Sequence, residues 1–255
     1  MHDLISKVFV RAFKDQFLQS SHDSATMDIG GARLAFTTDS YVVRPLFFPG
    51  GDIGKLAVCG TVNDLAMAGA EPLALSTAFI IEEGFSTESL QKIADSMAKT
   101  AESIGVALVT GDTKVVERGK GDGLYINTSG IGVIRINADI HPKNVVAGDM
   151  ILLSGDIGRH GIAVMSAREG LSFETEVESD CASLWSPVHA LLDGGIEIHC
   201  LRDLTRGGLA SALNEIASTR QVAMEIRENE IPVVPGVAAA CEILGFDPLY
   251  VANEG

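Results

Sequence analysis

Segments with the two-residue period of β-strands alternate along this chain with segments that have the 3.6-residue period of α-helices. This alternation restricts the chain to an α/β or α+β fold. Strands are expected at residues 25–29, 33–38, 73–81, 106–109 and 124–136. Helices are expected at residues 4–17, 53–68 and 87–104. Gly30-Gly31 predicts a hairpin between the first two strands, and the apolar run at 106–109 predicts a short buried strand that ends at Gly111-Asp112.

The pattern breaks at His141-Pro142-Lys143-Asn144, and a new strand-like run begins at residue 150. We therefore expect two domains, residues 1–140 and residues 141–255. The second should be an α+β domain, with a strand at 150–155 and helices at 209–218 and 238–244. Because residues 250–255 resemble the middle of a strand-to-loop transition, we expect this domain to be incomplete or its last strand to pair elsewhere.

The charge balance excludes some classes of partner. Acidic residues outnumber basic ones by 34 to 19, which gives a net charge of −15. Such a chain repels phosphate backbones and anionic lipids, so binding to nucleic acid or membranes is disfavoured. A bound nucleotide would need Mg²⁺ between its phosphates and the acids. No apolar run approaches the roughly 18 residues that a membrane helix needs, and the N-terminus is charged, so we predict a cytoplasmic protein.

Four aspartates stand where element ends or a helix would present them to one cavity. Asp39 follows a strand, Asp112 follows Thr110-Gly111, and Asp203 lies in the second domain. Asp64 lies beside Asn63 inside an otherwise apolar helix, where a polar pair without a function would be costly to bury. Mg²⁺ prefers such hard oxygen ligands. Each aspartate taken alone could also be a cap or turn residue.

Several other polar residues are candidates for binding phosphate. Lys55 follows Gly54 near a predicted helix start, where backbone N–H groups and an ammonium could meet a phosphate, although a solvated lysine fits equally well. Arg206 precedes Gly207-Gly208 and the next helix in the same way, although Gly-Gly is also a common turn. The remaining candidates follow a strand together, where a surface turn would explain them as well: Thr110, Gly111, Thr113 and Lys114.

Standard catalytic and nucleotide motifs are missing from the sequence. It contains no P-loop, no G-x-G-x-x-G after a strand, no G-x-S-x-G elbow and no H-E-x-x-H. The four cysteines form no C-x-x-C pair, which argues against a zinc cage or a redox motif. A nucleotide site would therefore have to be built from the scattered acids.

Taken together, these motifs resemble the HypE family of hydrogenase expression/formation proteins. The matching segments, in the same order as in the family, are residues 36–42, 45–57, 60–66, 110–115, 203–208 and 252–255. The resemblance covers nearly the whole chain and is most specific at residues 38–66. It implies the two-domain fold of aminoimidazole ribonucleotide synthetase, in which the N-terminal domain dimerises through its sheet and ATP lies near the dimer interface.

The resemblance also implies roles for individual residues. Mg²⁺ would be held by Asp39, Asp64, Asp112 and Asp203. The nucleotide would be contacted by Lys55, Asn63, Thr110, Gly111, Thr113, Lys114 and Arg206. Asp64 and Glu254 would act in catalysis, with Glu254 as the candidate base.

The activity implied is the ATP-dependent dehydration of a thiocarboxamide on a C-terminal cysteine to a thiocyanate, the cyanide source for the iron of NiFe hydrogenases. The implied partners are a second copy of the chain, a carbamoyltransferase of the HypF type and the HypC–HypD complex. The family's N-terminal glycine-rich stretch and C-terminal cysteine tail have no counterpart in these residues, so we expect no turnover of the usual substrate. Two alternatives remain: an enzyme of the same fold such as selenophosphate synthetase, and a non-catalytic ATP-binding module.

Overall fold

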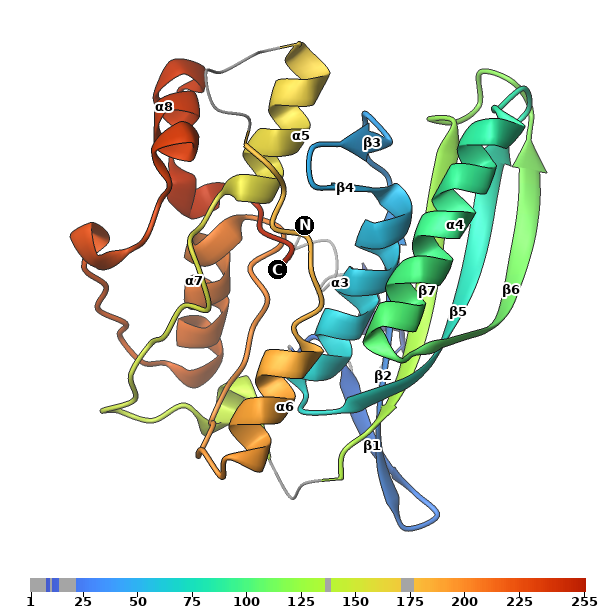
Figure 1. The fold of residues 1–255 in the computed structure, drawn as a ribbon. Coiled ribbons are helices and arrows are strands. Elements are labelled where there is room, and N and C mark those ends of the chain that lie inside the picture. The colour runs from blue at the N-terminus through green and yellow to red at the C-terminus, as the bar shows by residue number, and fades with distance from the viewer. Residues whose placement is uncertain (1–7, 10, 14–21, 136–138, 171–176) are drawn as a thin grey trace.

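A five-stranded sheet forms the centre of the first unit (Figure 1). The computed structural model describes residues 8, 9, 11–13, 22–135, 139–170 and 177–255. The strands are β1 (Ala25–Ile29), β2 (Ala32–Tyr41), β5 (Glu71–Glu82), β6 (Ala107–Val116) and β7 (Leu124–Val133), in the spatial order β1-β2-β7-β5-β6. A small hairpin of β3 (Phe47–Phe48) and β4 (Gly51–Asp52) stands apart from it.

The expected hairpin is confirmed, since β1 and β2 pair antiparallel around Gly30 and Gly31, which both have positive φ. The strands expected at 73–81 and 124–136 correspond to β5 and β7. Most of the helix expected at 4–17 lies outside the described residues, within which Arg11–Phe13 (α2) is helical.

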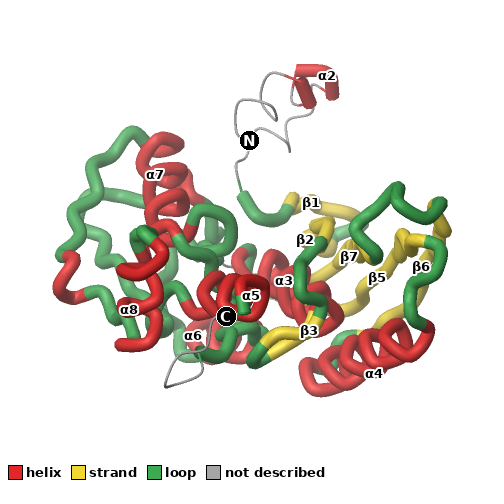
Figure 2. Tube along the Cα trace, turned by 90° about the horizontal axis from the view of Figure 1, so that it is seen from above, coloured by secondary structure: helices red, strands yellow, loops and turns green. Residues whose placement is uncertain are grey.

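Two helices cover one face of the sheet (Figure 2). They are α3 (Ile53–Met67) and α4 (Thr87–Ile104), as the apolar spacing predicts. Helix α4 ends at Gly105 in the left-handed conformation and connects the parallel strands β5 and β6. The core between helices and sheet includes Val58, Val62, Leu75, Ile93, Met97, Leu124 and Ile126. Helix α3 is buried on nearly every side, because the second unit packs on the surface that the sheet leaves free.

Strand β6 corrects the expectation of a short buried strand at 106–109. It runs for ten residues through Gly111 and Asp112, and almost all of them are exposed. The reason is its place at the edge of the sheet, where β5 is its single ladder neighbour among the described strands. The apolar residues Leu108, Val109 and Val115 are therefore exposed instead of packed under a helix.

The second unit is helical in its described part (Figure 1). Its helices are α5 (Arg159–Glu169), α6 (Trp185–Asp193), α7 (Gly208–Arg220) and α8 (Pro235–Leu244), with short 3-10 turns η3 (Pro142–Asn144), η4 (Glu228–Glu230) and η5 (Pro248–Tyr250). Helices α7 and α8 confirm the expected helices at 209–218 and 238–244, and Cys241 is buried as expected.

The strand expected at 150–155 is absent. Residues 150–153 join no ladder with any described residue, and Met150 and Leu152 are more than four-fifths exposed. The apolar run was therefore a misleading signal, because no neighbouring segment in the described chain offers it a pairing edge.

The two units meet along α3. Val188 and Leu192 of α6 pack on Ala66 and Met67 at the end of α3, together with Ile140 of the linking segment. None of the described helices is both long and apolar enough to cross a lipid bilayer.

Candidate active site

Three carboxylates from distant parts of the chain meet beside α3. Each of Asp23, Asp64 and Asp203 offers an oxygen that lies within 4.8 Å of those of the other two. Asp23 precedes β1, Asp64 projects from α3, and Asp203 lies in the loop before α7. The structure thus brings together Asp64 and Asp203, two of the four acids expected to bind a cation, and adds a third.

Both the side chain and the backbone carbonyl of Asp64 accept hydrogen bonds from neighbouring hydroxyl groups. The Thr37 hydroxyl donates to Asp64 Oδ2 at 2.8 Å, and the Ser24 hydroxyl donates to the Asp64 carbonyl at 2.7 Å. Thr37 faces α3 because β2 alternates, with Ala35, Thr37 and Tyr41 turned toward the helix. Asp39 has the same parity and shares that face.

Asp23 is the site residue that the sequence did not reveal. Arg202 Nη1 lies 3.0 Å from its Oδ1, while its Oδ2 is buried and has no hydrogen-bond partner among the described residues. His22 holds the local backbone, because its Nδ1 accepts the Asp23 N–H at 2.8 Å and its Nε2 lies 2.9 Å from the Ile140 carbonyl oxygen. The only available signal was an acid two residues before a strand, which many surface turns share.

Burial, followed by mutual repulsion, raises the pKa values of the carboxylates in this cluster. Burial raises the pKa of Asp64 well above its ordinary value, and the charges of Asp203 and Asp23 raise it further. Burial and the Asp23 charge raise the pKa of Asp203 to about 8, against the opposing effect of Arg202. Asp39 lies near enough for its charge to contribute in the same direction to both. Such a set of crowded, partly unbonded oxygens fits a divalent cation such as Mg²⁺.

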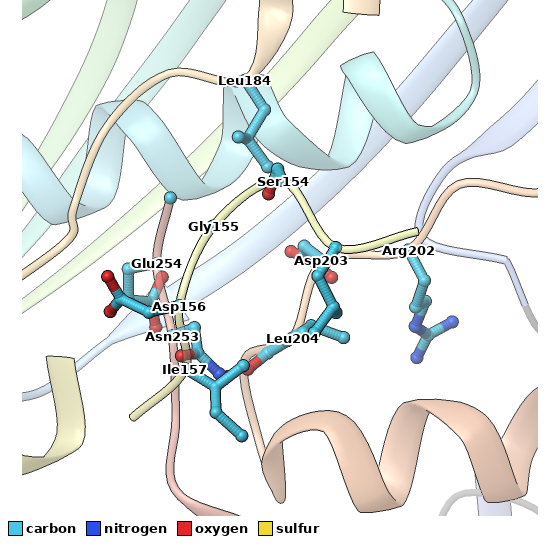
Figure 3. Close-up of a pocket in the computed structure, with 12 residues that line it drawn as sticks. Ser154, Gly155, Asp156, Ile157, Leu184, Arg202, Asp203, Leu204, Asn253 and Glu254 are labelled. Atoms are coloured by element: carbon cyan, nitrogen blue, oxygen red, sulfur yellow. The ribbon is translucent and has the colours of Figure 1, made fainter. Parts of the chain in front are cut away.

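Glu254 lines a pocket together with Asp203, one member of the cluster (Figure 3). It lines a cavity of about 40 Å³ together with Asp203, Asp156 and Asn253. Burial raises the pKa of Glu254 well above its ordinary value, and Asp203 and Asp180 add to the effect. The cavity has room for water or an ion but is far smaller than the roughly 300–1,000 Å³ of a nucleotide-sized pocket.

Asn63 connects the two units. Its Nδ2 donates to the Ala182 carbonyl at 3.0 Å and more weakly to that of Glu254 at 3.4 Å, and its Oδ1 accepts the Leu184 N–H at 2.7 Å. These hydrogen bonds to backbone groups offset the free-energy cost of burying the Asn63 amide. A nucleotide contact by Asn63 stays a prediction, since its amide is already engaged.

Lys55 lies in the first turn of α3, as expected, and its contact with a phosphate stays a prediction. The carboxylate of Asp52 caps α3 by accepting the N–H groups of Gly54 and Lys55 at 2.7 and 3.2 Å. Lys55 Nζ donates to the Gly50 carbonyl at 2.9 Å. The backbone donors that were to meet a phosphate are therefore occupied within the chain.

The candidates on β6 lie away from the cluster within one protomer. Asp112 pairs with Ala78, which pairs with Asn127, which pairs with Ser40, so three strand spacings of about 4.8 Å each separate Asp112 from β2. Since directly paired residues share a face, Asp112, Thr110 and Lys114 point to the face that α3 leaves open.

The other two residues of the β6 set have the opposite parity. Gly111 pairs with Thr77 and Thr113 with Phe79. A Cβ on Gly111 would lie 2.2 Å from the Thr77 carbonyl oxygen, so glycine there serves the close approach of β6 to β5.

Arg206 lies exposed just before α7 and makes no hydrogen bond or ion pair with other described residues. It precedes Gly207, the N-cap of α7. Gly207 adopts the left-handed conformation and, as a glycine, has no side chain to cap the first turn. The role of Arg206 toward a phosphate stays a prediction.

Comparison with known proteins places this arrangement in context. Residues 21–134 match the family model described as AIR synthase related protein, N-terminal domain, and residues 146–255 match the corresponding C-terminal domain. A carbamoyl dehydratase HypE from Bradyrhizobium diazoefficiens is 54% identical over all of this chain and 74% of its own length.

Two solved structures are similar over nearly the whole chain. The HypE chain of a HypE–HypF complex is 52% identical, with a TM-score of 0.94 over 98% of this chain and 81% of its own. A HypE in complex with ATP is 50% identical, with a TM-score of 0.86 over 100% of this chain and 76% of its own.

The two consecutive domains define a protein of the AIR synthase-related class. Within that class, the sequence identities of about one half to HypE proteins, over nearly the whole chain, determine the family. The chain belongs to the HypE family, the carbamoyl dehydratases of hydrogenase maturation.

Proposed function

We propose that the carboxylates beside α3 bind Mg-ATP and that the chain uses it to dehydrate a cysteine thiocarboxamide to a thiocyanate. The observation that carries this proposal is the meeting of Asp23, Asp64 and Asp203, one of which has a buried oxygen without a partner among the described residues. The ATP complex of a HypE that is 50% identical supports the nucleotide.

The cation would be held by Asp23, Asp64 and Asp203. Asp39 would be a further ligand, since it lies on the same face of β2 as Thr37, which contacts Asp64. When bound, Mg²⁺ neutralises phosphate charge and the repulsion among these carboxylates. The chain contributes their convergence, which Thr37 and Arg202 maintain through contacts with Asp64 and Asp23.

The proposed reaction converts R–S–C(=O)–NH₂ and ATP to R–S–C≡N, ADP and inorganic phosphate. The amide oxygen takes the γ-phosphoryl group and leaves with it as phosphate, while the nitrogen loses both of its protons, one to a base and one to the departing phosphate. We assign the removal of a nitrogen proton to Glu254. Its raised pKa makes it, once ionised, a stronger base than an exposed carboxylate.

The open face of the sheet is the proposed dimer interface. It exposes apolar side chains on several strands, namely Phe36, Leu73, Ile80 and Ile131, next to the exposed edge residues Val109 and Val115. Asp112 and Lys114 lie on this face or at its edge, on strand β6. Dimerisation through this face would therefore place them next to the partner protomer. Their contact with the nucleotide or its cation is proposed on that basis.

A carbamoyltransferase of the HypF type is the proposed partner, supported by the HypE–HypF complex of the 52% identical relative. Association with a HypC–HypD complex and a cytoplasmic location remain predictions of the sequence.

Calorimetric titration with Mg-ATP tests the nucleotide site. We expect saturable binding to the unsubstituted chain and a loss of at least tenfold in affinity for Asp64→Asn. The absence of binding to the unsubstituted chain would remove the proposal. Phosphate release that depends on a peptide ending in S-carbamoylcysteine would support dehydration, whereas ATP binding without such release would favour a non-catalytic module.

A further inference from the structure

The segment of residues 179–184 joins the end of the chain to α3. Its Ala182 N–H donates to the Glu254 carbonyl at 3.1 Å, and its Ala182 carbonyl accepts from Asn63 at 3.0 Å. The segment is itself anchored to the first unit, because the Ser179 N–H donates to the Pro49 carbonyl at 2.8 Å. The main chain at Glu254 is therefore held from one side by the 179–184 segment.

Asp180 makes the second contact with that main chain. Its Oδ1 accepts the Glu254 N–H at 3.2 Å, so the carbonyl and the N–H of Glu254 are both bonded to this one segment. The fit is close, since a Cβ on Gly255 would lie 2.0 Å from the Asp180 carbonyl oxygen. Glu254 thus has little freedom to move its backbone without breaking these bonds.

The carboxylate of Asp180 is an unusual choice for a backbone contact. It is largely buried, and its Oδ2 has no hydrogen-bond partner among the described residues. Burial raises the pKa of Asp180 to about 6, against the N–H donation from Glu254, with Asp156 and Arg159 acting in opposite directions nearby. Burying this carboxylate costs free energy, and its Oδ1 bonds to the backbone of the candidate base.

We propose that Asp180 is a positioning residue for the dehydration, which holds the Glu254 backbone through Oδ1 and so fixes Glu254 at the cavity that it lines with Asp203. The inference rests on the proposed function of Glu254 as the base. It assigns Asp180 no contact with the nucleotide or with the cation.

The first test separates positioning from binding by steady-state kinetics. The assay measures phosphate released from ATP in the presence of a peptide ending in S-carbamoylcysteine. Asp180→Ala should lower kcat at least tenfold with the KM for ATP changed less than twofold. Asp180→Asn retains an acceptor oxygen and should restore kcat to within about threefold of the unsubstituted chain.

A second measurement does not depend on activity. Hydrogen–deuterium exchange of peptides covering residues 252–255 should become at least tenfold faster in Asp180→Ala and remain slow in Asp180→Asn. The matched control is Asp149→Ala, which removes a carboxylate that accepts the Val146 N–H at 2.9 Å outside this cavity. It should leave both the kinetics and the exchange of residues 252–255 unchanged.

The outcomes distinguish the two proposals. If the unsubstituted chain releases no phosphate, the dehydration fails, and the exchange experiment alone decides the role of Asp180. Unchanged exchange in Asp180→Ala overturns the inference whatever the activity. Equal loss of kcat in Asp180→Ala and Asp180→Asn also overturns it, because the acceptor oxygen would then not be the operative feature.

Discussion

Asn63 Oδ1 accepts the Leu184 N–H at 2.7 Å and so ties the middle of α3 to the start of α6, 121 positions further along the chain. We predict that Asn63→Ala lowers the free energy of unfolding by about 2 kcal/mol, because it removes a buried amide and leaves the half-buried Leu184 N–H and the Ala182 carbonyl without their partner. Urea unfolding measures the change. The control is Asn214→Ala, whose exposed amide bonds only within α7 and which should cost less than about 1 kcal/mol.

Removing one charge from the acid cluster should stabilise the ligand-free chain. Asp64→Asn keeps an acceptor for Thr37 and relieves repulsion from Asp203 and Asp23, so the melting temperature in chelator should rise by ~3 °C. The same substitution should weaken Mg-ATP binding at least tenfold. Thermal melts with and without Mg-ATP check both effects. A lower melting temperature in chelator would contradict the electrostatic account, and Asp95→Asn on the exposed side of α4 serves as control.

His160 should make stability depend on pH. It is buried, its Nδ1 lies 2.9 Å from the Ser179 hydroxyl, and burial lowers its pKa from 6.5 to about 4. The unfolded chain takes up the proton below pH 6.5 while the folded chain resists it, so stability is lost as pH falls toward 4. Each pKa unit is worth about 1.4 kcal/mol, which gives about 3 kcal/mol in all.

Other buried groups titrate in the same range, so the comparison must be made between variants. Asp203 and Glu254, whose raised pKa values favour the protonated form, act in the opposite direction. The difference in unfolding free energy between the unsubstituted chain and His160→Asn should therefore shrink between pH 7 and 4.5. Exposed His189 provides the control in His189→Asn. A difference that does not change with pH would contradict the assignment.

The open face of the sheet should carry the dimer. Ile80 is 44% exposed on the face opposite α3 and α4, so Ile80→Glu should convert dimers to monomers in sedimentation velocity at micromolar concentration. Ile243 on α8 is 70% exposed, and Ile243→Glu should leave the association unchanged. Sedimentation of the unsubstituted chain as a monomer would count against an interface on this face.

The sequence predicts the first unit well where period and punctuation agree. Helix α4 spans the expected residues 87–104, and Gly30-Gly31 marks the hairpin. Asp64 also stood out, because an acid beside an amide inside an apolar helix needs partners. Position in the sheet is not encoded locally, and for this reason the apolar run at 106–109 did not reveal that β6 is an edge strand.

The rest of the site depends on contacts across the chain. Asp23 acquires its importance from Arg202, some 180 residues away, and nothing in its own neighbourhood signals this. The bonds that occupy Asn63 come from residues 182–184, so a local polar pattern could suggest a ligand but could not reveal these backbone partners. The boundary at 140/141 stays a prediction, and the family matches end at 134 and begin at 146.

The 179–184 segment has a mechanical consequence. Because it bonds to Pro49 and Asn63 of the first unit and to Glu254 of the second, a change in the angle between the units would also change the separation of Glu254 from Asp64. A ligand that binds Glu254 and Asp64 together would therefore favour one angle between the units, and a partner protein that favours the same angle would bind cooperatively with that ligand. Through this segment, partner binding and ligand binding at Glu254 and Asp64 would be coupled.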